Sequence, residues 1–309
     1  GFQRCLQKNI FRHCQRSKPS RESPKKKHSC PVALIHRAAG LLSNAGISNP
    51  VFEAELFLAN LLDVQRHDLY LNPHFVSKKI ERKFFNIVLK RCNHFPVAYL
   101  LGNAYFYEYS FKIKPGVFIP RPETETIIDV ACDLFKDKTK PLKILDICTG
   151  SGILAIVLAK IFTNSKIIAV DISEKAVNIA RENIYLHKLE NRVNVLRTDI
   201  FPDKNENFDF IVSNPPYLTD VEMKNIPDEV KREPFQALYG GISGTDIIKR
   251  IIDITPRILK KDGFIIMEIS PHQVSYFRDT DIYGLEFFGI FKDLYGFQRV
   301  VVLRSGANN

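Results

Sequence analysis

The sequence of 309 residues is 45% hydrophobic and 25% charged, an ordinary globular balance, and its length favours two domains. Its six cysteines form no C-x-x-C pair and its eight histidines no H-x-x-x-H pair, which argues against a zinc site and predicts free thiols in a reducing compartment. No apolar run approaches the length of a membrane span. We therefore expect a soluble protein without a metal ion or a membrane partner.

The formal net charge of +10 is concentrated at the start of the chain. Residues 1–30 hold nine Lys and Arg against one acid, Glu22, so they carry +8 and the rest of the chain only +2. Because that remainder is nearly neutral, bulk charge does not indicate nucleic acid binding, and we expect no stable nucleic acid partner.

The basic segment 1–30 reads as a targeting signal. Cations recur at a spacing of four residues, at Arg4, Lys8, Arg12 and Arg16. On a helix this spacing places them along one face, which predicts a mitochondrial transit peptide and a location in the mitochondrial matrix. A disordered basic tail, or a nuclear signal around residues 25–27, is the alternative interpretation.

Residues 31–102 are predicted to form a small helical domain. Apolar residues recur every three or four positions from Ala33 to Val64, and Asn49-Pro50 opens a second helix as its cap and first residue. A third helix is predicted from Ser77 to Asn93. Its cations form a basic face that either contacts a partner or is merely solvated: Lys78, Lys79, Arg82, Lys83, Lys90 and Arg91.

A hairpin linker and a larger α/β domain follow. Residues 103–120 alternate apolar and polar side chains, the period of a β-hairpin. From residue 121 to 309 predicted strands alternate with helices at 152–162, 173–188 and 245–260, which indicates an open, mostly parallel sheet covered on both faces. The strands are predicted at 142–147, 166–171, 192–196, 208–213, 263–269, 285–291 and 298–304.

The first of these strands runs into Asp146-Ile-Cys148-Thr149-Gly150-Ser151-Gly152 and then a helix. Glycines allow the backbone to turn sharply and a ligand to lie against it, and the helix start offers free N–H groups. A dinucleotide fingerprint requires G-x-G-x-x-G, but Cys148 occupies the place of its first glycine. The carboxylate of Asp146 disfavours a pyrophosphate and favours a cationic ligand, which points to S-adenosylmethionine.

Asp171 ends the second strand, about 20 residues after the glycines, where an acid accepts hydrogen bonds from ribose hydroxyls. A helix N-cap is the structural alternative for Asp171. For Asp146 alone a structural role is an even stronger alternative.

Asn214-Pro215-Pro216-Tyr217 follows the fourth strand at the edge of the sheet where ligands bind. The two prolines fix the backbone and remove two N–H donors. The Asn214 side-chain oxygen and the Pro215 carbonyl remain as acceptors beside the Tyr217 ring, a rim suited to an NH₂ group on a planar system. A proline-rich loop that merely closes the strand is the alternative.

Taken together, four motifs resemble the HemK/PrmC family of release-factor glutamine N5-methyltransferases. They are Phe118-Ile-Pro-Arg121-Pro-Glu123-Thr-Glu125, the Asp146–Gly152 stretch, Asn214–Tyr217, and Glu233-Pro-x-x-Ala237-Leu238-x-Gly-Gly241-x-x-Gly244. The resemblance runs from about Ala33 to Arg304 and implies a seven-stranded Rossmann-like domain that binds S-adenosylmethionine. Asn-Pro-Pro-Tyr alone is shared with DNA adenine methyltransferases.

The resemblance also implies roles for further residues. Phe118 and Arg121 would form the cofactor wall, Asp199 and Ile200 would hold the adenine, and Glu233 would line the substrate pocket with Tyr217. Ordinary packing is the alternative for Phe118 and Arg121. Many relatives carry an aromatic residue at the Ile200 position and an Asp at the Tyr239 position, and the interval between Pro271 and Tyr283 is short for the expected helix.

The predicted activity is methyl transfer to the glutamine of the Gly-Gly-Gln motif in a mitochondrial release factor, by a monomer that binds this protein substrate. The small helical domain would help to recognise it. An N6-adenine DNA or RNA methyltransferase and a non-catalytic S-adenosylmethionine-binding module are the rival interpretations.

Overall fold

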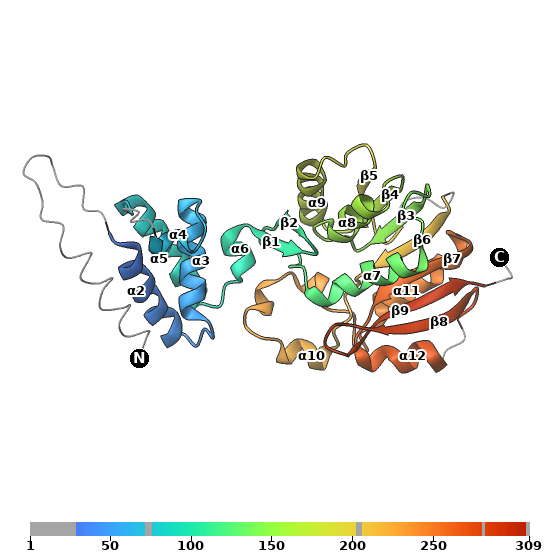
Figure 1. Ribbon diagram of the computed structural model, residues 1–309. Helices are drawn as coiled ribbons and strands as arrows, with labels where there is room; N and C mark the ends of the chain where they lie inside the picture. Colours follow the sequence, from blue (N-terminus) through green and yellow to red (C-terminus); the bar gives the residue numbers. More distant parts are fainter. Residues whose placement is uncertain (1–28, 72–75, 202–205, 280–281, 307–309) are drawn as a thin grey trace, which may run out of the picture. The chain divides into compact units, whose positions relative to one another are not determined.

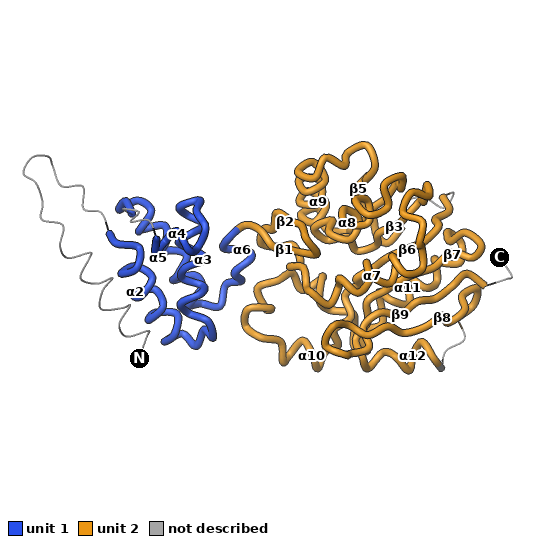
Figure 2. The backbone as a smooth tube through the Cα atoms, in the orientation of Figure 1, with its two compact units in different colours: residues 1–101 blue, residues 102–309 orange. Residues whose placement is uncertain are grey.

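The computed structural model describes residues 29–71, 76–201, 206–279 and 282–306. The chain divides into two compact units, and the division falls between Leu101 and Gly102 (Figure 1, Figure 2). The predicted transit peptide lies outside the described residues except for its last two. Of these, Ser29 exchanges backbone hydrogen bonds of 3.1 Å with Val76. Ser29 therefore belongs to the folded first unit.

The first unit is a helical bundle, as predicted. A proline opens both α2 and α3, at a position where its missing N–H has no helical partner to lose. Ser77 caps α5 by accepting a hydrogen bond from the Ile80 N–H. The helices enclose one apolar core, to which Leu34, Leu42, Phe57, Phe84 and Val88 contribute. Their bounds are Pro31–Asn44 for α2, Pro50–Leu62 for α3, Asp68–Leu71 for α4, Lys78–Cys92 for α5 and Val97–Leu101 for α6.

One cation of the predicted basic face on α5 is not at the surface. Arg91 is buried and donates to both carboxylate oxygens of Glu53 on α3, at 2.6 and 3.0 Å. Its inclusion in that face was wrong, because it follows Phe84 and Val88 at helical spacing and so shares their inward side. The other five cations are exposed: Lys78, Lys79, Arg82, Lys83 and Lys90.

The predicted hairpin forms from β1 (Asn103–Phe106) and β2 (Tyr109–Lys112), and it belongs to the second unit. The backbone groups of Lys112 at the edge of β2 find their hydrogen-bond partners in the side chain of Asn183, on α9 (Glu174–Leu186). The Asn183 carboxamide accepts from the Lys112 N–H at 2.7 Å and donates to the Lys112 carbonyl at 3.1 Å. A side chain thus replaces a neighbouring strand and holds the hairpin against α9.

All seven predicted strands form, and they make one sheet in the order β5-β4-β3-β6-β7-β9-β8. The strands from β5 to β7 are parallel, and β9 runs antiparallel to both of its neighbours. The predicted seven-stranded Rossmann-like fold is therefore confirmed. The bounds are Lys143–Ile147 for β3, Lys166–Asp171 for β4, Val193–Arg197 for β5, Phe208–Ser213 for β6, Leu259–Glu268 for β7, Leu285–Lys292 for β8 and Gln298–Ser305 for β9.

Helices cover both faces of the sheet, because successive strand residues point to opposite sides. On β3, Ile144 joins the core beneath α7, α8 and α9, whereas Leu145 joins the core beneath α11 and α12. The two layers are visible on either side of the strands in Figure 1. The helix bounds are Glu125–Leu134 for α7, Ile153–Ile161 for α8, Asp220–Asn225 for α10, Asp246–Ile254 for α11 and Val274–Asp279 for α12.

Two segments differ from the sequence-based prediction. The helix predicted for 245–260 ends at Ile254, because Pro256 lies in the 3₁₀ turn Thr255–Arg257 that follows it, and β7 begins already at Leu259. The short interval after Pro271 still accommodates a helix, α12, of six residues.

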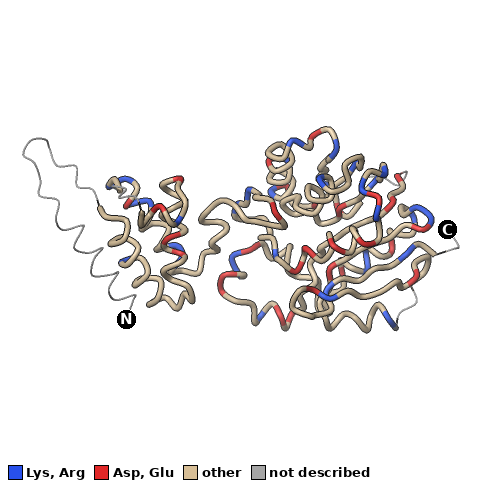
Figure 3. Tube along the Cα trace, in the orientation of Figure 1, with Lys and Arg blue, Asp and Glu red and all other residues tan. Residues whose placement is uncertain are grey.

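Basic and acidic residues are mixed in the part of the chain that the structure describes, as the net charge of +2 calculated without residues 1–30 implies. Figure 3 shows Lys and Arg interspersed with Asp and Glu along the second unit. Among the described helices, none has the length and apolar character that crossing a membrane requires.

Phe210 on β6 belongs to an aromatic cluster in the core that is centred on Phe135. It is fully buried, stacks on Phe135 with ring centroids 4.5 Å apart, and contacts Phe162 edge-on at 5.8 Å. Phe210→Ala should lower the free energy of unfolding by about 3–5 kcal/mol, measured by urea denaturation. The matched control Phe288→Ala, at a side chain 48% exposed, should cost about 1 kcal/mol or less. Equal losses in the two variants would contradict the placement of Phe210 in the core.

Candidate active site

A cavity of about 390 Å³ lies at the carboxyl ends of β3, β4, β5 and β6. The strand order reverses at β3, with β4 on one side and β6 on the other, and ligands of open α/β sheets bind at such a reversal. The volume is that of a small-molecule site. The walls come mainly from residues 148–151, 171–173, 198–200, Asn214, Pro216, 116–118 and 234–237.

The loop after β3 turns as the glycines require. Gly150 and Gly152 have φ angles of +58° and +84°, and a Cβ on Gly152 would lie 3.2 Å from the Ala180 Cβ. Cys148 also has a positive φ, +61°, which costs a residue with a side chain roughly 1–2 kcal/mol. Cys148, Thr149, Gly150 and Ser151 line the cavity, whereas Gly152 starts α8 behind them.

Asp146 lies beneath this loop rather than on the cavity wall, which corrects the prediction that it contacts the cofactor directly. Its side chain is fully buried, and Oδ2 accepts from the Thr149 hydroxyl at 2.5 Å and from the Ala155 N–H at 3.1 Å. Burial raises the pKa of Asp146 to about 7. Within the described residues its Oδ1 has no hydrogen-bond partner. Asp146 therefore fastens the loop to α8 and leaves one buried acceptor unfilled.

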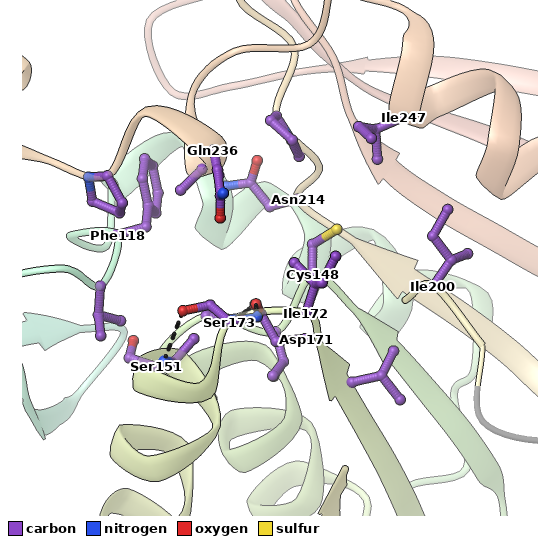
Figure 4. A pocket seen from close by; sticks show the side chains of 18 of the residues that line it. Phe118, Cys148, Ser151, Asp171, Ile172, Ser173, Ile200, Asn214, Gln236 and Ile247 are labelled. Atoms are coloured by element: carbon purple, nitrogen blue, oxygen red, sulfur yellow. Dashed lines mark hydrogen bonds between the residues drawn. The ribbon is translucent and has the colours of Figure 1, made fainter. Parts of the chain in front are cut away.

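Asp171, at the end of β4, reaches the opposite wall of the cavity from Asn214 (Figure 4). Asp171 Oδ2 accepts a hydrogen bond from the Gly150 N–H, and Asp171 Oδ1 accepts one from the Ser173 N–H, both at 2.9 Å. Burial raises the pKa of Asp171, and these two N–H groups oppose the rise. Ser173, not Asp171, is the N-cap of α9. The structure therefore leaves the Asp171 carboxylate facing the cavity, as a cofactor role requires.

Asp199 and Ile200 form one end of the cavity, together with two residues of α11 that the sequence did not indicate. The Asp199 carboxylate accepts from the Arg250 guanidinium at 2.8 Å. Ile247 lines the same region, and Figure 4 shows its side chain and that of Ile200 pointing toward this end. No sequence signal marked Arg250 or Ile247, because α11 joins the cavity only through the folding of the sheet.

Asn214 extends from the end of β6 into the cavity. The preceding residue fixes the strand end, because the Ser213 hydroxyl donates to the Ile147 carbonyl of β3 at 2.8 Å. The Asn214 carboxamide donates from Nδ2 to the Thr124 hydroxyl at 3.0 Å. Pro216 also lines the cavity, whereas Pro215 is buried outside the lining.

Tyr217 is turned away from the cavity, unlike the predicted ring beside the Asn214 rim. Its hydroxyl donates to Glu268 Oε1 at 3.0 Å, and its ring packs on the core beneath α11. Burial raises the pKa of Tyr217 well above its usual range. The inward turn follows from this buried carboxylate, which offers the hydroxyl a partner.

Arg121 and Glu233 are paired with each other instead of lining the cavity. The Arg121 guanidinium donates to Glu233 Oε1, and Oε2 accepts from the Ile119 N–H at 3.0 Å. Arg121 also lies 5.0 Å from the Phe118 ring centroid. Arg121 is therefore not part of the cavity lining, whereas Glu233 lines a second pocket that shares Phe235 and Tyr239 with the first. The Arg121–Glu233 pair joins two wall segments, one carrying Phe118 and the other Gln236, which both line the cavity.

The charge of this site suits a cation. Asp199 is balanced by Arg250, but Asp171 also lines the cavity and Asp146 lies just beneath it with an unfilled acceptor, so the field favours a positively charged ligand over a pyrophosphate. Apolar side chains at Ile172, Ile200 and Ile247 suit a flat ring. The described residues contain no group of His, Cys, Asp and Glu that could hold a metal ion. The fold and this cavity define an S-adenosylmethionine-dependent methyltransferase.

Comparison with known proteins narrows this class. Residues 33–102 match the PrmC N-terminal domain family and residues 108–241 the methyltransferase small domain family. The release factor glutamine methyltransferase of Clostridium botulinum (strain Hall) is 35% identical over 88% of this chain and 98% of its own length. That of Rhodopirellula baltica is 36% identical over 89% of this chain and 96% of its own. The chain belongs to the release factor glutamine methyltransferase family.

A solved structure shares the fold at much lower identity. The hMettl16 catalytic domain in complex with MAT2A 3′UTR hairpin 6 has a TM-score of 0.50 and 15% identity, over 77% of this chain and 86% of that chain. This likeness concerns the fold alone.

Asp171→Ala should weaken S-adenosylmethionine binding by roughly 1–3 kcal/mol, because a charged acceptor is lost at the cavity wall. Titration calorimetry measures this. Glu174→Ala is the matched control, because Glu174 starts α9 and pairs with Arg197 at 3.3 Å outside the cavity lining. Unchanged affinity in Asp171→Ala would contradict the assignment of Asp171 to the cofactor.

Proposed function

We propose that this enzyme transfers a methyl group from S-adenosylmethionine to the side-chain amide nitrogen of the glutamine in the Gly-Gly-Gln motif of a mitochondrial peptide-chain release factor. One observation carries the proposal. Asn214, whose carboxamide oxygen can accept a hydrogen bond from an NH₂ group, lines the same cavity as the glycine loop and Asp171. The acceptor and the methyl donor would thus share one enclosed space.

Methyl transfer to an amide requires that the enzyme orient the amide nitrogen rather than deprotonate it with a strong base. An amide nitrogen is a poor nucleophile, because its lone pair is delocalised into the carbonyl group. Asn214 Oδ1 would accept an N–H of the substrate amide and hold its nitrogen in line with the methyl carbon. The bound cofactor supplies an electrophilic sulfonium methyl group. Transfer would form the nitrogen–carbon bond as the carbon–sulfur bond breaks, and the substrate nitrogen would then lose a proton to water.

The identity of the acceptor is supported by relatives whose names specify release factor glutamine methylation, and which this chain matches over most of its length. The first unit is the part that would recognise a folded substrate. Its match to the PrmC N-terminal domain and the exposed cations of α5 support that role.

The decisive assay incubates the full chain with labelled S-adenosylmethionine and a panel of acceptors: folded mitochondrial and bacterial release factors, a free Gly-Gly-Gln peptide, and DNA and RNA containing adenine. Mass spectrometry should place the methyl group on the Gly-Gly-Gln glutamine only when the folded domain presents it, with a mitochondrial factor preferred. A methyl group on adenine, Lys or Arg would contradict the proposal, and no transfer to any acceptor would favour a binding module.

Asn214→Ala tests whether the Asn214 side-chain oxygen orients the substrate amide. S-adenosylmethionine affinity should stay within about tenfold, or about 1.4 kcal/mol, whereas the rate of transfer should fall by about 10² or more. Asn225→Ala, at an exposed carboxamide on α10 that bonds the Val221 carbonyl, is the matched control and should leave the rate near that of the wild type. An equal rate in Asn214→Ala and wild type would exclude Asn214 from the chemistry.

Residues 1–30 support the mitochondrial part of the proposal through their charge of +8. A fluorescent protein that carries these residues should be imported into mitochondria, and replacement of Arg4, Lys8, Arg12 and Arg16 by Gln should prevent the import. Fluorescence microscopy and protease protection measure this. Import of the neutralised segment, or mitochondrial accumulation of the chain without residues 1–30, would contradict the assignment.

A further inference from the structure

A second pocket adjoins the cavity and has no part in the chemistry proposed above. It measures about 450 Å³ and lies in the loop between β6 and α11, where α10 and the 3₁₀ turns Val230–Arg232 and Phe235–Ala237 contribute to its wall. Two of its residues, Phe235 and Tyr239, also line the cavity. Their ring centroids are 4.8 Å apart. The two spaces therefore meet at this pair of rings.

The loop that forms the second pocket is fixed by its own hydrogen bonds. At its base Leu218 donates to the Leu238 carbonyl and accepts from the Gly240 N–H, both at 2.9 Å. At the start of α10 the Thr219 hydroxyl accepts from the Glu222 N–H at 3.2 Å, and the Glu222 carboxylate accepts from the Thr219 N–H at 2.8 Å. A pocket that is formed in advance needs little ordering when a ligand binds, which favours affinity.

The wall of the second pocket suits an apolar side chain. It includes four apolar residues: Met223, Ile226, Phe235 and Leu238. Of its four charged residues, Lys231 is paired with Asp228 at 2.7 Å. Glu233 is paired with Arg121. The other two are one acid and one base, so the lining carries no excess of either sign. An apolar ligand gains from leaving water here, whereas a charged ligand would give up its hydration for no net opposite charge.

The position of the second pocket beside the cavity indicates which part of a substrate would fill it. A glutamine whose side chain enters the cavity brings its neighbours in the chain to the adjoining surface, because consecutive Cα atoms are about 3.8 Å apart. In an extended segment the second residue along points its side chain to the same side, roughly 7 Å away. The two residues before the glutamine of Gly-Gly-Gln have no side chain, so the residues after it must supply the occupant.

We propose that the second pocket is a specificity subsite, which takes an apolar side chain from one of the first two residues after the acceptor glutamine. Phe235 and Tyr239 are the wall that the glutamine and this side chain share. The identity of the occupant rests on the proposed function, whereas the pocket and its apolar wall are features of this chain alone. A second anchored side chain fixes the backbone of the glutamine, and a peptide that ends at the glutamine lacks it.

Met223→Lys tests the subsite, because Met223 lines the second pocket but not the cavity. On a folded release factor kcat/KM should fall by about tenfold or more, the factor that one buried apolar side chain contributes, while S-adenosylmethionine affinity stays within about twofold. Val221→Lys is the matched control, because Val221 lies on the same helix, is 68% exposed and lines neither pocket. It should match wild type. A Met223→Lys enzyme as active as wild type would overturn the proposal.

Variants of the release factor test the same contact with the enzyme unchanged. Replacing the two residues after the glutamine by Asp, one at a time, should lower kcat/KM of the wild-type enzyme by about tenfold at the position that fills the pocket. Met223→Lys should recover about fivefold of that loss, because it offers the new carboxylate an opposite charge. Val221→Lys should recover little. Losses that simply multiply at both positions would speak against the subsite.

The binding step can be observed without methyl transfer, because the chain has two methionines, Met223 and Met267. Met267 lies in β7 and is 1% exposed, so it serves as an internal reference. In protein labelled with ¹³C at the methionine methyl groups, a folded release factor should shift the Met223 signal, assigned by its loss in Met223→Leu, and leave the Met267 signal in place. The factor with Asp at the occupying position should shift neither.

These signals separate the inference from the proposed function. A factor that is methylated but leaves the Met223 signal unmoved would overturn the inference. A factor that shifts this signal without being methylated would contradict only the proposed function, and a factor that does neither would contradict both.

Discussion

The pairing of β3 with β6 is the constraint on which the site depends. Ile147 and Ser213 are adjacent across the two strands, and the Ser213 hydroxyl adds a bond to the Ile147 carbonyl. The glycine loop begins at the residue after Ile147, and Asn214 follows Ser213 directly. Two stretches more than 60 residues apart in the chain are therefore placed at one edge of the sheet by the ladder alone.

The rest of the cavity is assembled around that edge by side chains that the ligand need not touch. Glu233 is buried and receives both the Arg121 guanidinium and the Ile119 N–H, so the segments before α7 and after α10 are fastened together. Asp146 does the same for the glycine loop and α8. The site is thus held by buried acceptors that satisfy backbone and hydroxyl donors, which fixes its walls without filling its interior.

Asp146 and Glu268 share an unusual property. Each is almost completely buried, each has one oxygen without a hydrogen-bond partner among the described residues, and burial raises the pKa of each. Such groups cost folding free energy, and perturbed titratable groups of this kind cluster at functional sites. The left-handed backbone of Cys148 adds a further local cost at the same place.

The sequence by itself determined the elements and the motifs. Apolar runs of strand length, separated by helical periodicity, were sufficient to locate every strand of the sheet, and the pattern is clearest for inner strands such as β3 and β6, which are buried on both faces. Glycines and prolines at strand ends then marked the loops that line the cavity. Residues whose role depends on position along one element, such as Asp171 at the end of β4, were accessible in the same way.

Only the tertiary structure decided how individual side chains are paired. Arg121 looks like a cofactor contact in sequence but pairs with Glu233, and Tyr217 turns inward because Glu268, 51 residues away, offers it a buried acceptor. Arg250, Ile247 and Thr124 gave no signal of their own. Hydrogen-bond partners distant in sequence leave no periodic trace, so the choice among a polar residue's possible partners is made when the sheet and its helices come together.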